Sequence, residues 1–558
     1  MKERITRAIG IALTLGFIVV ACTPKEHSTQ IANKVSLLSK QLSPQMSGLL
    51  DGQFIFMDSL QQKGDSLWGE YLIQKRGVLV KKHPFSLYIT DQKRINFFSP
   101  DFEGQMDYQG TFEGEDTIHL QLSKRRKILW FIPWGRKTFQ LHLTPYKIRH
   151  HKVLAGRYEE DLFHTFSKDE DVEYGRAKGF WTSFKSDNMD YLEILEKGTK
   201  RALRKKELPL RLDIYQPEKD PSKKRPLLLL IHGGGFYIGD KTDPTYLALA
   251  NYYVKKGYVV ASMNYRMGFL PSSKAVERAG VRGVQDARAA LRFLVAHHET
   301  YGFDPNHIFL MGSSAGAITS LNVAFLDESE RPKSSLGGLL HKDLGKLNES
   351  GNNLTNTFTI KGIINMWGAV DTTAIMDDNE QVALLHFHGD QDKIVPYSCG
   401  FPFANTPGKI NRWLMPRMCG SKAIHAMALS KKWDSRLFRF KGKGHMPHLD
   451  EHHHFNAYFD TILHQSRIFL LEQLADPGYT IEGERAITRK QDASIYTLGY
   501  QKKPHLVNWY IKGGVIKATY EDHVDVLWYD QAKNHEISCE VSNEIGLVTN
   551  LSLKVDVP

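Results

Sequence analysis

The chain has 558 residues, of which 41% are hydrophobic and 24% are charged, and its formal net charge is +11. This length is too great for a single hydrophobic core, so we expect three or four domains. The positive charge favours an anionic envelope or acidic polymers over nucleic acid as partners, with plain solubility as the alternative explanation.

The first 22 residues have the features of a secretory signal. Lys2, Arg4 and Arg7 precede fourteen mostly apolar residues, 8–21, which are too few to span a bilayer. The following "VVAC" (19–22) resembles a bacterial lipobox, which implies that Cys22 carries lipid. We therefore expect a lipid-anchored protein of the bacterial cell envelope, on its periplasmic or surface face. An uncleaved anchor and an ordinary signal peptide are the alternatives.

Residues 23–170 are predicted to form a β-rich domain. Short segments with strand-like alternation, among them "GQFIFM" (52–57) and "TFQLHL" (138–143), are separated by Gly, Asp and Lys turns. The charged stretch 151–190 shows little periodicity, so we assign no element to it.

Residues 171–475 alternate between apolar strands and amphipathic helices. The strand segments include "RPLLLLI" (225–231), "HIFLMG" (307–312) and "VALLHFHG" (382–389), and helical spacing appears between them, as in 284–302. This alternation predicts a doubly wound, mostly parallel α/β sheet.

Two glycine-rich motifs follow strands of this domain. "GSSAG" (312–316) is a Gly-x-Ser-x-Gly pattern with Ser314 at its centre and Ser313 at an x position. A strand before it and a helix after it are the context in which such a turn exposes a serine hydroxyl. "HGGGF" (232–236) lets backbone N–H groups approach a substrate oxygen.

With these motifs the chain resembles the α/β-hydrolase esterases, particularly bacterial carboxylesterases with an HGGGF oxyanion motif. The resemblance covers residues 176–475 and rests on four motifs in the expected order: "HGGGF" (232–236), "GSSAG" (312–316), "HGDQDKIVP" (388–396) and "GKGH" (442–445).

The resemblance implies a role for each motif. A serine hydroxyl needs an imidazole to accept its proton, and the imidazole needs a carboxylate to fix its tautomer. The order Ser, Asp, His is met by Ser314, Asp392 and His445, with Asp390 as the rival acid. The expected oxyanion hole consists of the backbone N–H groups of Gly234, Gly235 and Ala315.

The implied activity is that of a serine carboxylesterase that forms an acyl-enzyme on Ser314 and needs no cofactor. Its expected substrates are small or carbohydrate-linked esters. Because "HGDQDKIVP" is closer to the motif of prolyl oligopeptidases and dienelactone hydrolases, a serine peptidase is one alternative. A non-catalytic surface-binding lipoprotein is the other, since a fold does not determine a function.

The histidine-rich segment "HMPHLDEHHH" (445–454) raises the question of a metal site. The helical ligand pattern His-Glu-x-x-His and an accompanying cysteine are both absent from it. We therefore expect a solvated polar stretch and no metal.

Residues 476–558 again alternate as strands, for example in "HVDVLWYD" (523–530) and "HEISCEVSN" (535–543). The segment resembles an immunoglobulin-like β-sandwich.

Cysteine usage predicts one disulfide. With Cys22 bearing lipid and Cys539 in another domain, Cys399 and Cys419 remain as partners in an oxidising compartment. They flank an insertion rich in aromatic, Met and Pro residues, which we expect to form one wall of the substrate pocket and to steady Asp392. A surface loop with a purely structural bridge is the alternative.

Overall fold

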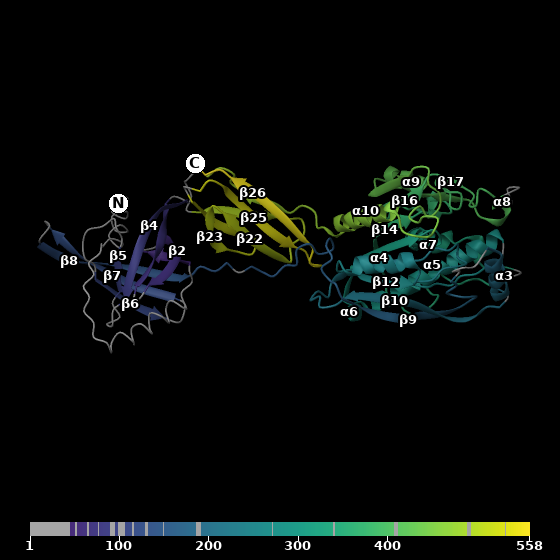
Figure 1. The fold of residues 1–558 in the computed structure, drawn as a ribbon, viewed down its shortest axis with the longest axis horizontal. Helices are drawn as coiled ribbons and strands as arrows, with labels where there is room; N and C mark the ends of the chain where they lie inside the picture. Colours follow the sequence, from purple (N-terminus) through teal and green to yellow (C-terminus); the bar gives the residue numbers. More distant parts are fainter. Residues whose placement is uncertain are drawn as a thin grey trace. The chain divides into compact units, whose positions relative to one another are not determined.

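The structure is a computed structural model, shown in Figure 1. It describes residues 45–50, 53–63, 66–75, 78–89, 95–98, 107–113, 117–128, 132–148, 150–185, 191–202, 204–270, 272–338, 341–406, 411–487, 493–529 and 532–557. The predicted signal segment and Cys22 lie outside these residues. Within the described ranges, no helix is both long and apolar enough to cross a membrane.

The chain forms two compact units. We call Val153–Asp476 with Ser542–Thr549 the α/β unit, and the remainder, Met1–Lys152, Pro477–Val541 and Asn550–Pro558, the β unit. The first predicted boundary, after residue 170, falls inside strand β9 (Phe166–Gly179). This strand pairs with β10 (Lys206–Pro217) and therefore belongs to the α/β unit. Most of its side chains are exposed or half-buried, as at a sheet edge, so a pattern of buried apolar residues is weak there.

The α/β unit is built on an eight-stranded sheet with the order β19-β16-β14-β13-β11-β12-β10-β9. The strands from β19 to β12 run parallel to one another, and β10 is antiparallel to both of its neighbours. The bounds of the strands not given above are β11 (Arg225–Ile231), β12 (Val259–Met263), β13 (Phe303–Ser313), β14 (Ile360–Met366), β16 (Ala383–Gly389) and β19 (Ser435–Phe440).

Helices cover both faces of this sheet (Figure 1). Both faces need cover because successive side chains of a strand point to opposite sides of the sheet, and in β11 both sides are apolar. Leu227 and Leu229 belong to one buried cluster, and Leu228 and Leu230 belong to the other. The first cluster includes residues of α5 (Ser273–Ala296), α7 (Ala315–Phe325) and α9 (Ser421–Ser430), and the second those of α4 (Pro244–Val254) and α10 (Ala457–Leu474). This is the α/β-hydrolase arrangement predicted from the sequence. The unit also contains α3 (Tyr191–Ala202), α6 (His298–Tyr301), α8 (Asn411–Leu414), β15 (Ala369–Val370), β17 (Cys399–Gly400) and β18 (Met418–Gly420).

The short segment Ser542–Thr549 completes the α/β unit, although it is far from the rest of the unit in sequence. Ile545 is 1% exposed and packs in the same cluster as α4 and α10. Its carbonyl accepts a hydrogen bond from Tyr158 Oη at 2.6 Å, and Asn543 Nδ2 donates to the carbonyl of Leu474 at 2.9 Å. The predicted boundary after residue 475 misses this return of the chain.

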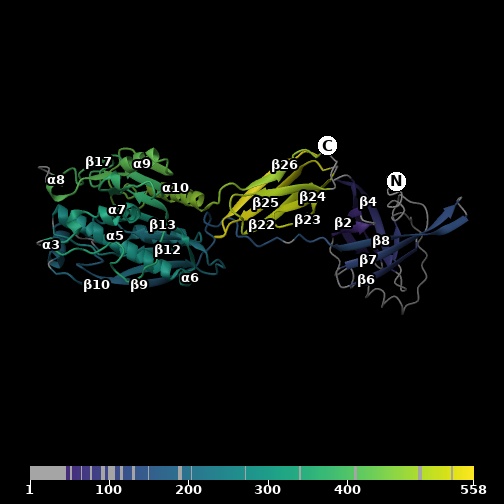
Figure 2. The same cartoon turned by 180° about the vertical axis from the view of Figure 1, so that it is seen from behind.

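The β unit contains the strands at both ends of the chain (Figure 2). The larger of its sheets has the order β20-β21-β24-β4-β3-β2-β1-β8-β7-β6, with β23 paired to β24 and β5 to β4, and β22-β25-β26 form a second sheet. The bounds are β1 (Met46–Leu50), β2 (Gln53–Lys63), β3 (Ser66–Lys75), β4 (Val78–Ile89), β5 (Ile95–Phe98), β6 (Asp107–Glu113), β7 (Thr117–Ile128), β8 (Ile132–Pro145), β20 (Thr480–Gly483), β21 (Ser494–Gly499), β22 (Leu506–Lys512), β23 (Gly514–Thr519), β24 (His523–Tyr529), β25 (His535–Ser542) and β26 (Val548–Val555).

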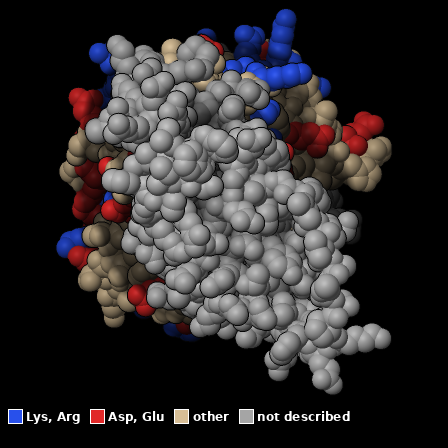
Figure 3. All heavy atoms as spheres, turned by 90° about the vertical axis from the view of Figure 1, so that its left-hand side faces the viewer, with Lys and Arg blue, Asp and Glu red and all other residues tan. Residues whose placement is uncertain are grey.

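The C-terminal strands enclose a core of their own. Trp528 of β24 and Trp509 of β22 belong to the same buried cluster, so the two sheets pack against each other. Cys539 lies in this core, where burial raises the pKa of its thiol to about 12. A packed pair of sheets agrees with the predicted sandwich, and its immunoglobulin-like character stays a prediction. Among the described residues coloured in Figure 3, Lys and Arg lie beside Asp and Glu, the mixed pattern of a solvated surface.

Candidate active site

Ser314 lies at a sharp turn between β13 and α7. Its backbone has φ 50° and ψ −119°, a conformation that residues other than glycine rarely adopt. A Cβ atom at Gly312 would lie 2.5 Å from the carbonyl carbon of Gly316, and one at Gly316 would lie 2.0 Å from the carbonyl oxygen of Ile231. Gly312 is therefore required for the strand to approach the start of α7 closely, and Gly316 for the turn to pack against the end of β11.

The three predicted catalytic side chains meet at this turn. His445 Nε2 is 3.1 Å from Ser314 Oγ, and His445 Nδ1 is 2.7 Å from Asp392 Oδ2. The other carboxylate oxygen of Asp392 accepts the backbone N–H groups of Ile394 at 2.8 Å and Val395 at 3.0 Å. Burial by itself would raise the pKa of Asp392, but hydrogen bonds from His388 and His445 outweigh it and hold that pKa well below its usual range.

Asp390, the rival acid, points elsewhere. Its carboxylate pairs with Arg439 at 2.6 Å and accepts the N–H of Gly442 at 2.7 Å. The structure thus brings Asp392, and not Asp390, into contact with His445.

The glycine loop after β11 lies against the Ser314 turn. Gly234 and Gly235 have φ values of +100° and +62°, and a Cβ atom at Gly233 would lie 3.0 Å from the carbonyl oxygen of Ser313. Ala315 is the first residue of α7, so its N–H has no acceptor within the helix. These are the three residues whose N–H groups were predicted to form an oxyanion hole.

Ser313 has a bonding partner of its own, away from His445. Its hydroxyl is 2.7 Å from the hydroxyl of Tyr246, which also accepts the N–H of Gly233 at 3.0 Å. Tyr246 is 3% exposed, so the link is buried. Ser313 therefore ties the turn to the glycine loop, a role that nothing in the sequence pattern indicated.

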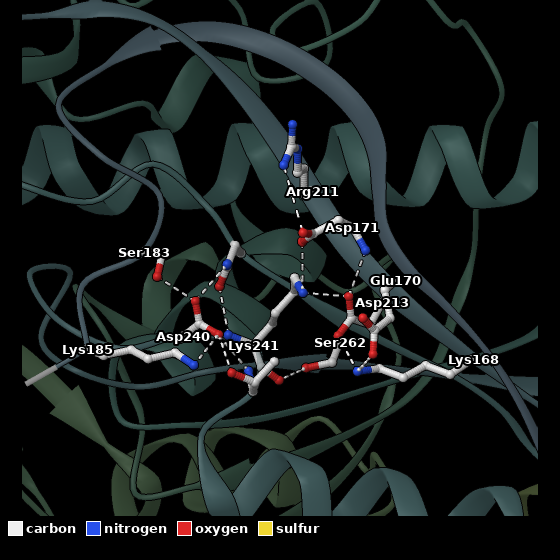
Figure 4. Close-up of polar contacts among 12 residues, drawn as sticks. Lys168, Glu170, Asp171, Ser183, Lys185, Arg211, Asp213, Asp240, Lys241 and Ser262 are labelled. Carbon is white, nitrogen blue, oxygen red and sulfur yellow. Dashed lines mark hydrogen bonds and ion pairs between the residues drawn. The ribbon is translucent and has the colours of Figure 1, made fainter. Parts of the chain in front are cut away.

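A polar network holds the far end of the glycine loop (Figure 4). The carboxylate of Asp240 accepts hydrogen bonds from Ser183 Oγ at 2.5 Å and from Asn264 Nδ2 at 3.0 Å. Next to it, Lys241 Nζ pairs with Asp213 at 2.5 Å and with Asp171 at 3.1 Å. The loop that carries Gly234 and Gly235 is thus fastened at its end by paired, largely buried charges, which favours one fixed loop geometry.

A mostly apolar hollow lies next to the Ser314 turn. Phe236 follows the predicted oxyanion glycines, and Ile318 accompanies Ser314 at the start of α7, where its N–H donates to the Ser314 carbonyl at 2.9 Å. The lining is Phe236, Val276, Glu277, Gly280, Val281, Val284, Ile318, Asn322, Leu326, Pro332, Asp371, Pro416 and Met418. The hollow suits an apolar group of an ester bound at Ser314.

The predicted disulfide is confirmed, since Cys399 and Cys419 are bonded. They lie opposite each other in the antiparallel pair β17–β18, with Cα atoms 4.0 Å apart, and β18 also pairs with β15. Pro416 and Met418, just before Cys419, line the apolar hollow. The stapled insertion therefore contributes part of the pocket wall.

Replacing both cysteines by serine is expected to lower the free energy of unfolding. The bridge spans 20 residues, and closing a loop of that length corresponds to about 3 kcal/mol in the chain-entropy model. Urea unfolding of the double variant measures the loss, with Cys539→Ser as a control that removes no bridge. Equal unfolding midpoints for the double variant and the unaltered protein would contradict the expectation.

The histidine-rich segment divides between core and surface. His448 is 3% exposed, its ring stacks on Trp367 at 4.9 Å, and its Nε2 is 3.1 Å from Thr245 Oγ1. His452 and His454 are exposed, and their backbone N–H groups donate to the Asp450 carboxylate. In the described part of the chain, no group of three His, Cys, Asp or Glu side chains converges as metal ligands.

Comparison with known proteins shows that part of the chain is similar to esterases. Residues 212–384 match the BD-FAE family. The chain is 40% identical over 112 residues to gut esterase 1 of Caenorhabditis elegans, a match that covers 20% of each chain. It is 37% identical over 112 residues to carboxylesterase 3B of Mus musculus, covering 20% of this chain and 19% of that relative. The matches thus span about a fifth of the length of these relatives.

A solved structure, a truncated form of a carbohydrate esterase from gut microbiota, aligns with a TM-score of 0.35 and 18% identity, covering 56% of this chain and 98% of that chain. The α/β unit thus has the sheet order of an α/β-hydrolase, and part of it is similar in sequence to esterases.

Proposed function

We propose that the protein is a serine carboxylesterase that forms an acyl-enzyme on Ser314. The observation that carries this proposal is the chain of contacts from Ser314 Oγ to His445 Nε2 at 3.1 Å and from His445 Nδ1 to Asp392 at 2.7 Å. Because Nδ1 faces a carboxylate it carries the hydrogen, which leaves Nε2 free to accept the serine proton.

The proposed reaction has two halves. As Ser314 Oγ attacks the ester carbonyl carbon, its proton moves to His445 Nε2, and the carbonyl oxygen becomes an anion stabilised by the N–H groups of Gly234, Gly235 and Ala315. The bond to the alcohol then breaks, and the alcohol leaves with the proton from His445. Water attacks the acyl-enzyme and gives a proton to His445, which returns it to Ser314 as the carboxylic acid departs.

We propose that the apolar hollow receives the acyl group and that the alcohol side accepts small or carbohydrate-linked alcohols. The walls formed by Phe236, Ile318 and Met418 support the first part. An ester panel varied in acyl length, with sugar acetates included, tests both parts, and a chromogenic dipeptide amide in the same panel tests peptidase activity. Cleavage of the amide in preference to the esters would overturn the esterase proposal.

We also propose that lipid on Cys22 anchors the protein in a bacterial envelope membrane. The support is the signal-like segment 1–21 and the motif "VVAC". Cys22→Ser is expected to move the protein from the membrane fraction to the soluble fraction, because one acyl signal is lost. Immunoblotting of the two fractions measures this, and unchanged membrane retention of the variant would contradict the anchor.

A further inference from the structure

The acid of the proposed triad contacts two imidazoles. Asp392 Oδ2 is 2.7 Å from His445 Nδ1 and 3.3 Å from Nε2 of His388, the residue before Gly389 at the end of β16. His388 is 0% exposed, so this second contact lies in the protein interior.

A chain of hydrogen bonds behind His388 determines which of its nitrogens carries the hydrogen. Asn365 Oδ1 accepts the N–H of Gly368 at 2.8 Å, which identifies its other side-chain atom, Nδ2, as the donor. That amide lies 2.7 Å from His386 Nδ1 and 3.0 Å from Ser421 Oγ, so both atoms accept from it. The other hydrogen-bond partner of Ser421 Oγ is His388 Nδ1, 2.8 Å away. Because Ser421 Oγ already accepts from Asn365, its hydroxyl donates to this nitrogen.

His388 therefore carries its hydrogen on Nε2. Within the described part of the structure, this nitrogen faces two acceptors, Asp392 Oδ2 at 3.3 Å and the carbonyl of Val395 at 3.2 Å. Asn365, His386, His388 and Ser421 are each 0% exposed, so water does not compete with the chain. His388 acts as a fixed donor to the carboxylate that also holds His445.

We propose that His388 is a positioning residue that sets the basicity of His445 by sharing the Asp392 carboxylate. The inference rests on the proposed esterase function. A donor on Oδ2 withdraws negative charge from the oxygen that faces His445 Nδ1, so loss of this donor should strengthen the electrostatic stabilisation of protonated His445 by Asp392. The same contact fixes the rotation of the carboxylate toward His445 Nδ1.

The other titratable groups around His388 do not compete with Asp392 for its Nε2 hydrogen. The ring of Tyr397 lies 5.6 Å away, and burial raises its pKa, so it is neutral over the working range. Burial also lowers the pKa of His386 to about 3, which keeps it neutral. Asp390 and Arg439 form an ion pair with each other beyond Tyr397. Asp392 is thus the charge with which His388 is in contact.

The test is the pH dependence of kcat/KM for p-nitrophenyl acetate. His388→Leu removes the donor and is expected to lower kcat/KM about tenfold and to move the acid limb of the profile upward by about half a pH unit. His388→Gln places an amide N–H near the position of Nε2 and is expected to restore both quantities most of the way. Ser421→Ala keeps the imidazole but removes the hydroxyl that fixes its tautomer, so it should move the limb in the same direction by less.

His425→Gln is the matched control. His425 is a half-buried histidine of α9 that bonds Ser435 Oγ at 2.8 Å and lies outside the chain that leads to Asp392, so its replacement should leave the profile unchanged. A lowered kcat/KM with an unmoved acid limb in His388→Leu, or a glutamine variant that behaves like the leucine variant, would overturn the inference. Failure of the proposed function is distinguishable, because the unaltered protein would then lack ester turnover and labelling by a fluorophosphonate.

Discussion

Ser314→Ala is expected to reduce ester turnover to near background and to abolish labelling by a fluorophosphonate probe. Removing the nucleophile of a comparable triad lowers kcat by about 10⁶-fold, since the remaining groups act only through it. The structure supports this residue because Ser314 Oγ faces His445 Nε2 at 3.1 Å. Steady-state kinetics with p-nitrophenyl acetate and mass spectrometry of the labelled peptide measure both effects.

Ser313→Ala is the matched control, one residue earlier in the same turn. Its hydroxyl bonds to Tyr246 at 2.7 Å, so the variant loses a buried hydrogen bond worth about 1 kcal/mol but no group in contact with His445. We expect most of the activity to remain and the unfolding midpoint to fall slightly. Probe labelling that persists in Ser314→Ala and disappears in Ser313→Ala would exchange the two roles.

Asp392→Asn is expected to lower kcat by about 10⁴-fold while leaving the fold in place. An amide in this position can donate to His445 Nδ1, which would put the imidazole hydrogen on Nε2 and leave no acceptor for the serine proton. The depressed pKa of Asp392 gives the sign of the accompanying pH effect. The stability that its ionised form contributes is present above the unfolded pKa of about 4 and is lost as the pH falls toward the folded value.

Asp390→Asn provides the comparison. Asp390 is half-buried at the end of β16 and bonds to Arg439 and Gly442, so its replacement is expected to change kcat by no more than a few-fold. Activity measurements at pH 8, where both carboxylates are ionised, separate the two variants. A larger loss in Asp390→Asn than in Asp392→Asn would contradict the proposed assignment.

The parallel sheet and the Ser314, His445 and Asp392 cluster could be predicted because their signals are local. An uninterrupted apolar strand such as β11 and a glycine-framed serine each specify their structure within a dozen residues. The disulfide was predictable by elimination, since a chain with four cysteines leaves few pairings once lipid and domain assignments are made.

The supporting residues could not be predicted, because their partners are remote in sequence. His388 bonds Ser421, 33 residues away, and Ser313 bonds Tyr246, 67 residues away. No periodicity marks such pairs, and a buried histidine in a strand is indistinguishable from a core residue until the tertiary contacts exist. The two compact units differ from the predicted domains for a similar reason, since β9 and Ser542–Thr549 join the α/β unit through contacts with distant segments.

The return of Ser542–Thr549 to the α/β unit has a consequence for synthesis of the chain. A ribosome completes Asp476 well before it reaches Ile545. Until then the nascent α/β unit lacks the Ile545 side chain, which packs with α4 and α10, and the Ile545 carbonyl, which accepts a hydrogen bond from Tyr158. Most of the sandwich must be translated before those groups arrive. The packing of the α/β unit, which carries Ser314, is therefore still incomplete when Asp476 is made, because it depends on a segment translated after most of the C-terminal strands.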